Sequence, residues 1–262
     1  MNVVKGGPTV CGNTIGVILL NCVLPRMPGD IGNSSTFNFP VAYTMVMEGT
    51  QDRVVGYGSM PGSDKSLLRP FIDAAKYLEA QGVKAITTSC GFLALFQREM
   101  SQAVKIPVFA SSLIQVPFVA EMIGREKRVG ILTANGATLT EEHFNNVGWS
   151  TKDYKVAIQG MHKYPHYAAP MLRNQPYLNF PMVESEMITA ARNLVTEYPD
   201  IGAFVFECAN MPPYVKAVQD ALGLPVYDIV TLTNFVYDAV QPRTYERPGG
   251  ERMVRFACVT DV

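Results

Sequence analysis

The sequence lacks the charge patterns and long apolar segments that mark nucleic-acid-binding and membrane proteins. Its 262 residues include 22 basic and 23 acidic side chains, so the formal charge is only −1, and no basic run offers a surface for DNA, RNA or anionic lipid. The longest apolar run, residues 15–24, is too short to cross a bilayer and has no signal-peptide pattern. We therefore expect a cytoplasmic protein with no nucleic-acid partner and no membrane association.

Paired cysteine motifs are also absent, which excludes two common uses of the thiol. No CxxC motif occurs, so the pattern of a zinc ribbon or a thioredoxin-type redox site is missing. The cysteines are odd in number and widely spread, which favours reduced thiols over a disulfide framework. They are Cys11, Cys22, Cys90, Cys208 and Cys258. We interpret Cys11, Cys22 and Cys258 as packing or surface thiols, because none of them has a counterpart elsewhere in the chain.

Short apolar runs of strand length alternate with helix-like segments through most of the chain. Hydrophobic residues make up 48% of the sequence and charged residues 17%, as in α/β enzymes whose sheets are covered on both faces. The alternation predicts parallel sheets. The expected strands lie within residues 14–21, 83–90, 106–112, 128–135, 201–208 and 224–230.

Two of these strand-and-helix series match each other. Cys90 and Cys208 lie 118 residues apart, and so do Pro107 and Pro225 in the strands that follow them. Such a repeated order indicates an internal duplication. We therefore expect an α/β fold of two pseudo-symmetric lobes, each a mostly parallel sheet flanked by helices, with the active site in the cleft between them. The expected boundaries are 1–112 for the first lobe, 113–228 for the second and 229–262 for a segment that packs back on the first.

Each of the two matched cysteines ends a strand at the carboxyl edge of its sheet, where open α/β sheets bind ligands. A thiol there lies near unpaired backbone N–H groups at the start of a helix, which favour the thiolate. With a thiolate on one side of a carbon and a thiol on the other, the first removes a proton while the second delivers one. The pattern predicts a cofactor-independent racemase or epimerase that uses Cys90 and Cys208. The amides expected to hold a substrate carboxylate belong to Gly91, Phe92, Ala209 and Asn210.

Four segments make the sequence similar to the aspartate/glutamate/hydantoin racemase superfamily, over roughly residues 14–240. They are TTSCGF around Cys90, FECANMPPY around Cys208, PGDIGN at 28–33 and VGILTANGAT at 129–138. The resemblance implies two pseudo-symmetric lobes, catalysis without pyridoxal phosphate, and the two cysteines as the acid–base pair. It also implies that the substrate is an amino acid, a related small carboxylate or a hydantoin. Besides the amides named above, the substrate-binding residues that it implies are Asn21, Asp30, Tyr57, Thr133 and Asn135.

The residues beside the cysteines depart from the glutamate racemase pattern and leave other activities open. Glutamate racemases typically have Asn-Thr after the first cysteine and Thr-His after the second, whereas this chain has Gly-Phe and Ala-Asn. One alternative is a one-cysteine enzyme of the same superfamily, either a decarboxylase or a cis-trans isomerase of a small dicarboxylate. Another is a non-catalytic carboxylate-binding protein, since two lobes around a cleft also suit binding without chemistry.

An acidic residue, Glu207, directly precedes the second cysteine. Alternation along a strand points neighbouring side chains to opposite faces. We therefore expect Glu207 to support the site from behind or to have no role in it.

One proline-rich segment, residues 161–182, does not fit either series of elements. His162 and His166 have a spacing that suits a metal on a helix, but Pro165 lies between them and argues against a helix and hence against a metal site. The richness of the segment in Pro, Tyr and Met predicts a long loop. We expect this loop to be a lid or specificity loop, or else a contact in the homo-oligomer that we also expect.

Overall fold

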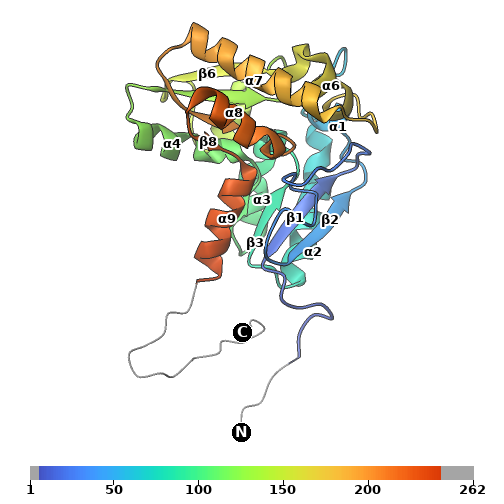
Figure 1. Ribbon diagram of the computed structural model, residues 1–262. Coiled ribbons are helices and arrows are strands. Elements are labelled where there is room, and N and C mark those ends of the chain that lie inside the picture. The colour runs from blue at the N-terminus through green and yellow to red at the C-terminus, as the bar shows by residue number, and fades with distance from the viewer. Residues whose placement is uncertain (1–5, 243–262) are drawn as a thin grey trace.

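The computed structural model describes residues 6–242 of the chain, which form two α/β lobes (Figure 1). Each lobe contains a four-stranded parallel sheet, with the strand order β2-β1-β3-β4 in the first and β6-β5-β7-β8 in the second. The strands of the first sheet are β1 (Ile15–Leu20), β2 (Val41–Val46), β3 (Ala85–Thr88) and β4 (Val108–Phe109). Those of the second sheet are β5 (Arg128–Thr133), β6 (Val156–Gly160), β7 (Ile201–Phe206) and β8 (Val226–Tyr227).

Helices follow most of the strands and cover the sheets. The α-helices are α1 (Gln51–Val54), α2 (Leu68–Ala80), α3 (Gln97–Ala103), α4 (Val116–Ile123), α5 (Glu141–Asn146), α6 (Pro165–Met171), α7 (Phe180–Glu197), α8 (Val215–Leu222) and α9 (Ile229–Val240). The 3-10 helices are η1 (Lys65–Leu67), η2 (Gly91–Phe96), η3 (Ser112–Gln115), η4 (Met161–Lys163) and η5 (Pro212–Tyr214). Within residues 6–242 no helix combines the length and the apolar character that crossing a bilayer requires.

The two sheets have the same topology, which confirms the predicted α/β fold and its internal repeat. In each sheet the first strand of the lobe lies between the second and the third, and the fourth strand pairs with the third. Gly16 in β1 and Gly130 in β5 are equivalent positions. A Cβ atom at Gly16 would lie 2.9 Å from Leu78 Cδ1, and one at Gly130 would lie 2.7 Å from Phe204 Cε1. Both strands therefore need glycine there, because a large neighbour packs directly on the backbone.

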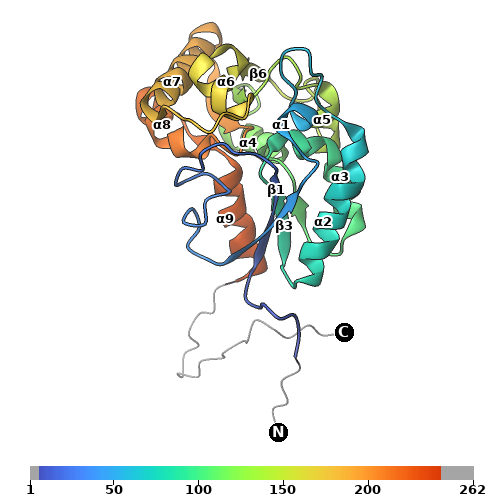
Figure 2. The ribbon, with the colours of Figure 1, turned by 90° about the vertical axis from the view of Figure 1, so that its right-hand side faces the viewer.

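Strand β1 is buried on both faces. Ile15 and Val17 pack with Leu232 of α9, whereas Ile18 belongs to the cluster that contains Phe71 of α2. Figure 2 shows the same arrangement, with α9 on one side of the first sheet and α2 and α3 on the other. Because both faces are covered, a ligand can approach this sheet only at an edge, and the carboxyl ends of the strands point toward the second lobe.

The proline-rich segment is not the long loop that we expected. It contains η4, α6 and the first turn of α7. Pro165 occupies the first position of α6, where a missing N–H costs nothing and the fixed φ angle suits the helix. Pro165, which we took as evidence against a helix, thus begins one. Helix α6 lies beside the pocket described in the next section.

Candidate active site

The two matched cysteines lie at equivalent places, and both face one narrow pocket. Cys90 follows β3 and Cys208 follows β7, so each thiol stands at the carboxyl end of the third strand of its sheet. Each is only 6% exposed. Both line the same pocket, together with residues of the loop after β1 and of α6. The structure therefore brings together two side chains that are 118 positions apart in the sequence.

The protein's own groups hold both thiols in the protonated form. Burial and, to a smaller extent, the nearby Glu207 carboxyl together raise the pKa of Cys208 to about 12. Burial, then Glu207 and Cys208, raise the pKa of Cys90 well above its ordinary value. We expected backbone amides to favour thiolates here. The amides of Phe92 and Asn210 do lower the pKa of their respective thiols, but desolvation outweighs a single N–H contact.

The Tyr167 hydroxyl, from α6, lies close to the Cys208 sulfur. Interaction with it lowers the pKa of the thiol, while the pKa of Tyr167 itself is raised, mainly by burial. The hydroxyl oxygen makes no hydrogen bond of ordinary geometry within the described part of the chain. Cys208 thus has a polar neighbour that is free to reorient toward a ligand or toward the sulfur.

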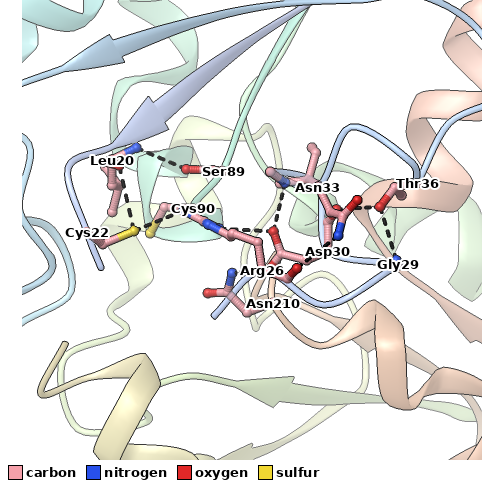
Figure 3. Close-up of polar contacts among 12 residues, drawn as sticks. Leu20, Cys22, Arg26, Gly29, Asp30, Asn33, Thr36, Ser89, Cys90 and Asn210 are labelled. Atoms are coloured by element: carbon pink, nitrogen blue, oxygen red, sulfur yellow. Dashed lines mark hydrogen bonds and ion pairs between the residues drawn. The ribbon is translucent and has the colours of Figure 1, made fainter. Parts of the chain in front are cut away.

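A basic side chain that the sequence did not single out, Arg26, forms part of the pocket wall. It lies in the loop after β1 and donates hydrogen bonds to Asp30 Oδ1 (3.0 Å) and to Cys22 Sγ (2.9 Å). Asp30 is 2% exposed, and its second oxygen accepts a hydrogen bond from Asn210 Nδ2 at 2.5 Å. Figure 3 shows Arg26 reaching between the Cys22 and Cys90 sulfurs on one side and Asp30 on the other. Asp30 therefore connects the first-lobe loop to Asn210, two residues after the second thiol.

Arg26 carried little signal in the sequence. It stands among Pro, Met and Gly residues in a loop, and nothing in its spacing connects it with either cysteine. The only available pointer was the expectation that the loop carrying Asp30 reaches the site. The i, i+4 pairing of Arg26 with Asp30 became visible only once that loop was folded.

Glu207 also lines the pocket, which corrects our expectation that it would point away. Strand β7 ends at Phe206, so the alternation of side chains does not continue to positions 207 and 208. Glu207 is 1% exposed. Its Oε2 atom accepts hydrogen bonds from Thr133 Oγ1 (2.8 Å) and the Ala134 amide (3.0 Å). Its Oε1 atom has no hydrogen-bond partner among the described residues.

Gly91 lies against Glu207, with no room for a side chain between them. A Cβ atom at position 91 would lie 2.1 Å from the Glu207 carbonyl oxygen and 2.2 Å from Oε1. No side chain fits there unless Glu207 moves. Gly91 of the first lobe and both the backbone and the carboxyl of Glu207 of the second lobe are thus in close contact beside the pocket.

The other residues implied by the resemblance lie around the pocket rather than on its wall. Asn135 Nδ2 donates to the Gly56 carbonyl (2.9 Å) and joins the two lobes. Asn21 Nδ2 donates to the Met47 carbonyl (3.0 Å). The remaining three are Phe92 and Ala209, which are buried in the core, and Tyr57, whose ring lies under the guanidinium of Arg173.

Three free cysteines occur within residues 6–242, namely Cys22, Cys90 and Cys208. Cys22 lines the pocket and is not the simple packing thiol that we expected. Cys11 is disulfide-bonded, which corrects our prediction of a reduced thiol, because proximity in the fold decides which cysteines pair. Cys258 lies outside the described residues. In the same part of the chain no group of three or more His, Cys, Asp or Glu side chains is placed to hold a metal ion.

Solved structures with this fold include a decarboxylase and a racemase. Arylmalonate decarboxylase superposes with a TM-score of 0.51 at 14% identity, covering 90% of this chain and 96% of that one. Glutamate racemase from Francisella tularensis subsp. tularensis superposes with a TM-score of 0.51 at 16% identity, covering 90% and 86%. These likenesses confirm the predicted superfamily fold.

Sequence comparison gives closer relatives, and they are lyases. The chain is 33% identical over 228 residues to dimethylsulfoniopropionate lyase 7 of Emiliania huxleyi, covering 84% of this chain and 65% of that protein. It is 30% identical over 235 residues to the dimethylsulfoniopropionate lyase of Durusdinium sp. clade D, covering 87% of this chain and 75% of that protein. The chain thus spans less than two thirds of the Emiliania protein. No protein-family model matches it.

These relatives are enzymes, but they do not confirm the isomerase activity that we predicted from the cysteine pair. The shared fold accommodates racemases and a decarboxylase, whereas the sequence relatives are lyases. With 30% identity across three quarters of the Durusdinium protein, the chain belongs to the dimethylsulfoniopropionate lyase family, built on the fold of the aspartate/glutamate/hydantoin racemase superfamily.

Proposed function

We propose that this protein is a lyase that cleaves dimethylsulfoniopropionate by β-elimination. The compound is a propionate whose third carbon carries a dimethylsulfonium group. A base removes a proton from the carbon next to the carboxylate, the electron pair of that C–H bond forms the C=C bond, and the C–S bonding pair leaves with sulfur. The products are dimethyl sulfide, acrylate and a protonated base. The observation that carries the proposal is the pocket that holds two buried thiols beside Arg26.

Arg26 is the group best suited to hold the substrate carboxylate. Its guanidinium lines the pocket and is fixed by Asp30, so it is oriented before a ligand arrives. A guanidinium has five N–H donors, and the contacts to Asp30 and Cys22 leave some of them for an anion. Negative charge builds on the carboxylate as the neighbouring C–H bond breaks, and a fixed cation stabilises that charge.

Cys208 is the better base of the two thiols. The Tyr167 hydroxyl and the Asn210 amide both lower its pKa, whereas Cys90 has only the amide of Phe92. A pKa of about 12 leaves little thiolate at neutral pH, but a sulfonium cation within about 4–6 Å favours the charged form of a thiol. The substrate thus helps to generate the base that attacks it.

An elimination needs one base, whereas a racemisation needs two. We therefore expect unequal effects of the two cysteine substitutions. The test follows dimethyl sulfide by gas chromatography and acrylate by NMR for the wild type, Cys208→Ser and Cys90→Ser. General-base catalysis contributes about 10²–10⁴-fold, so Cys208→Ser should lose about that much turnover, and Cys90→Ser should lose clearly less.

The competing activity is the racemase or epimerase that the paired thiols first suggested. Parallel samples in D₂O with single-enantiomer amino acids, hydantoins and small 2-substituted acids test it. Solvent deuterium at the α-carbon with loss of optical activity, abolished equally in both variants and with no dimethyl sulfide from the wild type, would replace the lyase by a two-base isomerase. Far-UV circular dichroism of each variant controls for misfolding.

A further inference from the structure

Glu207 is a buried acid on the wall of the pocket. None of the ion pairs formed within residues 6–242 includes it. Arg26, the basic residue on the same pocket wall, is paired with Asp30 instead. One carboxyl oxygen of Glu207 accepts two hydrogen bonds, and the other accepts none from the described residues.

Such a group is costly for the fold. A buried carboxylate without a partner is strongly disfavoured. A well-packed apolar residue or a glutamine would avoid the electrostatic cost. An unpaired acid that lines a pocket is a feature of ligand sites rather than of a stable core.

We propose that Glu207 is the counter-ion for the cationic group of the ligand, the sulfonium in the substrate class named above. This inference rests on the proposed function for the identity of that group. Together with Arg26, Glu207 gives the pocket one anionic and one cationic protein group. A ligand with a carboxylate and a non-titrating cation on a short chain complements both groups, whereas a simple carboxylate complements only Arg26.

The surroundings of Glu207 make its charge sensitive to pH near neutrality. Cys90, Cys208 and Tyr167 face it from the ends of β3 and β7 and from α6, and each stays neutral because its own pKa is raised. Thr133 and Ala134 at the end of β5 donate hydrogen bonds. Burial raises the pKa of Glu207 to about 7 despite those two donors. The cation site is therefore formed above neutral pH and lost below it.

Two unreactive ligands of nearly the same shape separate charge from size. 3-(Trimethylammonio)propionate carries the cation, and 4,4-dimethylpentanoate replaces the nitrogen by carbon. Calorimetry measures the ratio of their dissociation constants for the wild type, Glu207→Gln and Glu207→Asp at pH 8, and for the wild type at pH 5.5. Asp228→Asn is the matched control, because Asp228 is also a buried acid but caps α9 away from the pocket.

At pH 8 the wild type should bind 3-(trimethylammonio)propionate at least tenfold more tightly than 4,4-dimethylpentanoate. Glu207→Gln should bring the ratio close to one, Glu207→Asp should keep part of the preference, and Asp228→Asn should keep all of it. At pH 5.5 the carboxylate form of the free wild type falls about 30-fold, so the preference should fall toward that of Glu207→Gln. A folded Glu207→Gln protein with the wild-type ratio would overturn the inference, and so would a wild type that binds neither ligand or prefers the neutral one.

The lyase proposal is tested separately in the same preparations. A wild type that releases no dimethyl sulfide but shows the Glu207-dependent preference refutes the lyase and keeps Glu207 as a cation site. Release of dimethyl sulfide with a preference that does not change in Glu207→Gln keeps the lyase and refutes the role of Glu207.

Discussion

The substitution Glu207→Gln should stabilise the protein in a pH-dependent way. A pKa raised from 4.5 to about 7 corresponds to about 3 kcal/mol in favour of the neutral carboxyl, because a tenfold change in proton affinity is worth about 1.4 kcal/mol. Between these two values the folded protein retains a proton that the unfolded chain has released. The free energy of unfolding of the wild type therefore falls as the pH rises through this window.

Glutamine does not titrate, so the unfolding free energy of the variant does not fall in this way as the pH rises. Its amide oxygen can accept from Thr133 and Ala134 as Oε2 does, and its amide nitrogen takes the place of the unpaired Oε1. The difference in unfolding free energy, variant minus wild type, should rise by about 2–3 kcal/mol between pH 5 and pH 8. Urea unfolding at both pH values measures it, and the titration of His143 and other groups common to both proteins cancels. The same difference at pH 5 and pH 8 would show that Glu207 has an ordinary pKa.

Two further predictions concern the groups next to the thiols. Arg26→Gln should raise KM for dimethylsulfoniopropionate about 10–100-fold, because a charged hydrogen bond is worth about 1.5–3 kcal/mol. Arg26→Lys should recover part of this lost affinity. Steady-state kinetics measures KM, and an unchanged KM in Arg26→Gln would show that Arg26 does not bind the carboxylate. Gly91→Ala places a methyl group 2.1 Å from the Glu207 carbonyl oxygen and 2.2 Å from Oε1. It should therefore lower turnover at least tenfold and stability by about 1–3 kcal/mol. Wild-type turnover and stability would mean that both the backbone and the carboxyl of Glu207 can move away at little cost.

The fold was predictable because its signals are local and repeated. Buried strand-length runs and the matched spacing of Cys90 and Cys208 required only the rule that carboxyl ends of parallel strands share an edge. The helix around Pro165 was missed because a proline at the first position of a helix and one in a loop look alike in a sequence. The predicted fold thus came from periodicity, and the error came from a residue with two common uses.

The chemistry of the pocket was harder to predict because it depends on where loops and strands end. Arg26 reaches the thiols only through the fold of the loop after β1, and Glu207 faces them only because β7 stops one residue earlier. The direction of the thiol pKa shifts was also wrong from sequence. Proximity to backbone amides can be inferred from a motif, but the depth of burial that outweighs it is a property of the whole fold.

Raised thiol pKa values suit the elimination that we propose, although they first look unfavourable for a base. The product acrylate is an electrophile, and thiolates rather than thiols react with such compounds. While the sulfonium is bound, its charge favours the thiolate of Cys208 and pairs with Glu207. Once dimethyl sulfide has left as a neutral molecule, burial and then the Glu207 carboxyl again raise the pKa of both thiols. In this proposal the same carboxyl helps to bind the cationic substrate and, once the cation has left, keeps the cysteines in the thiol form that does not react with the product.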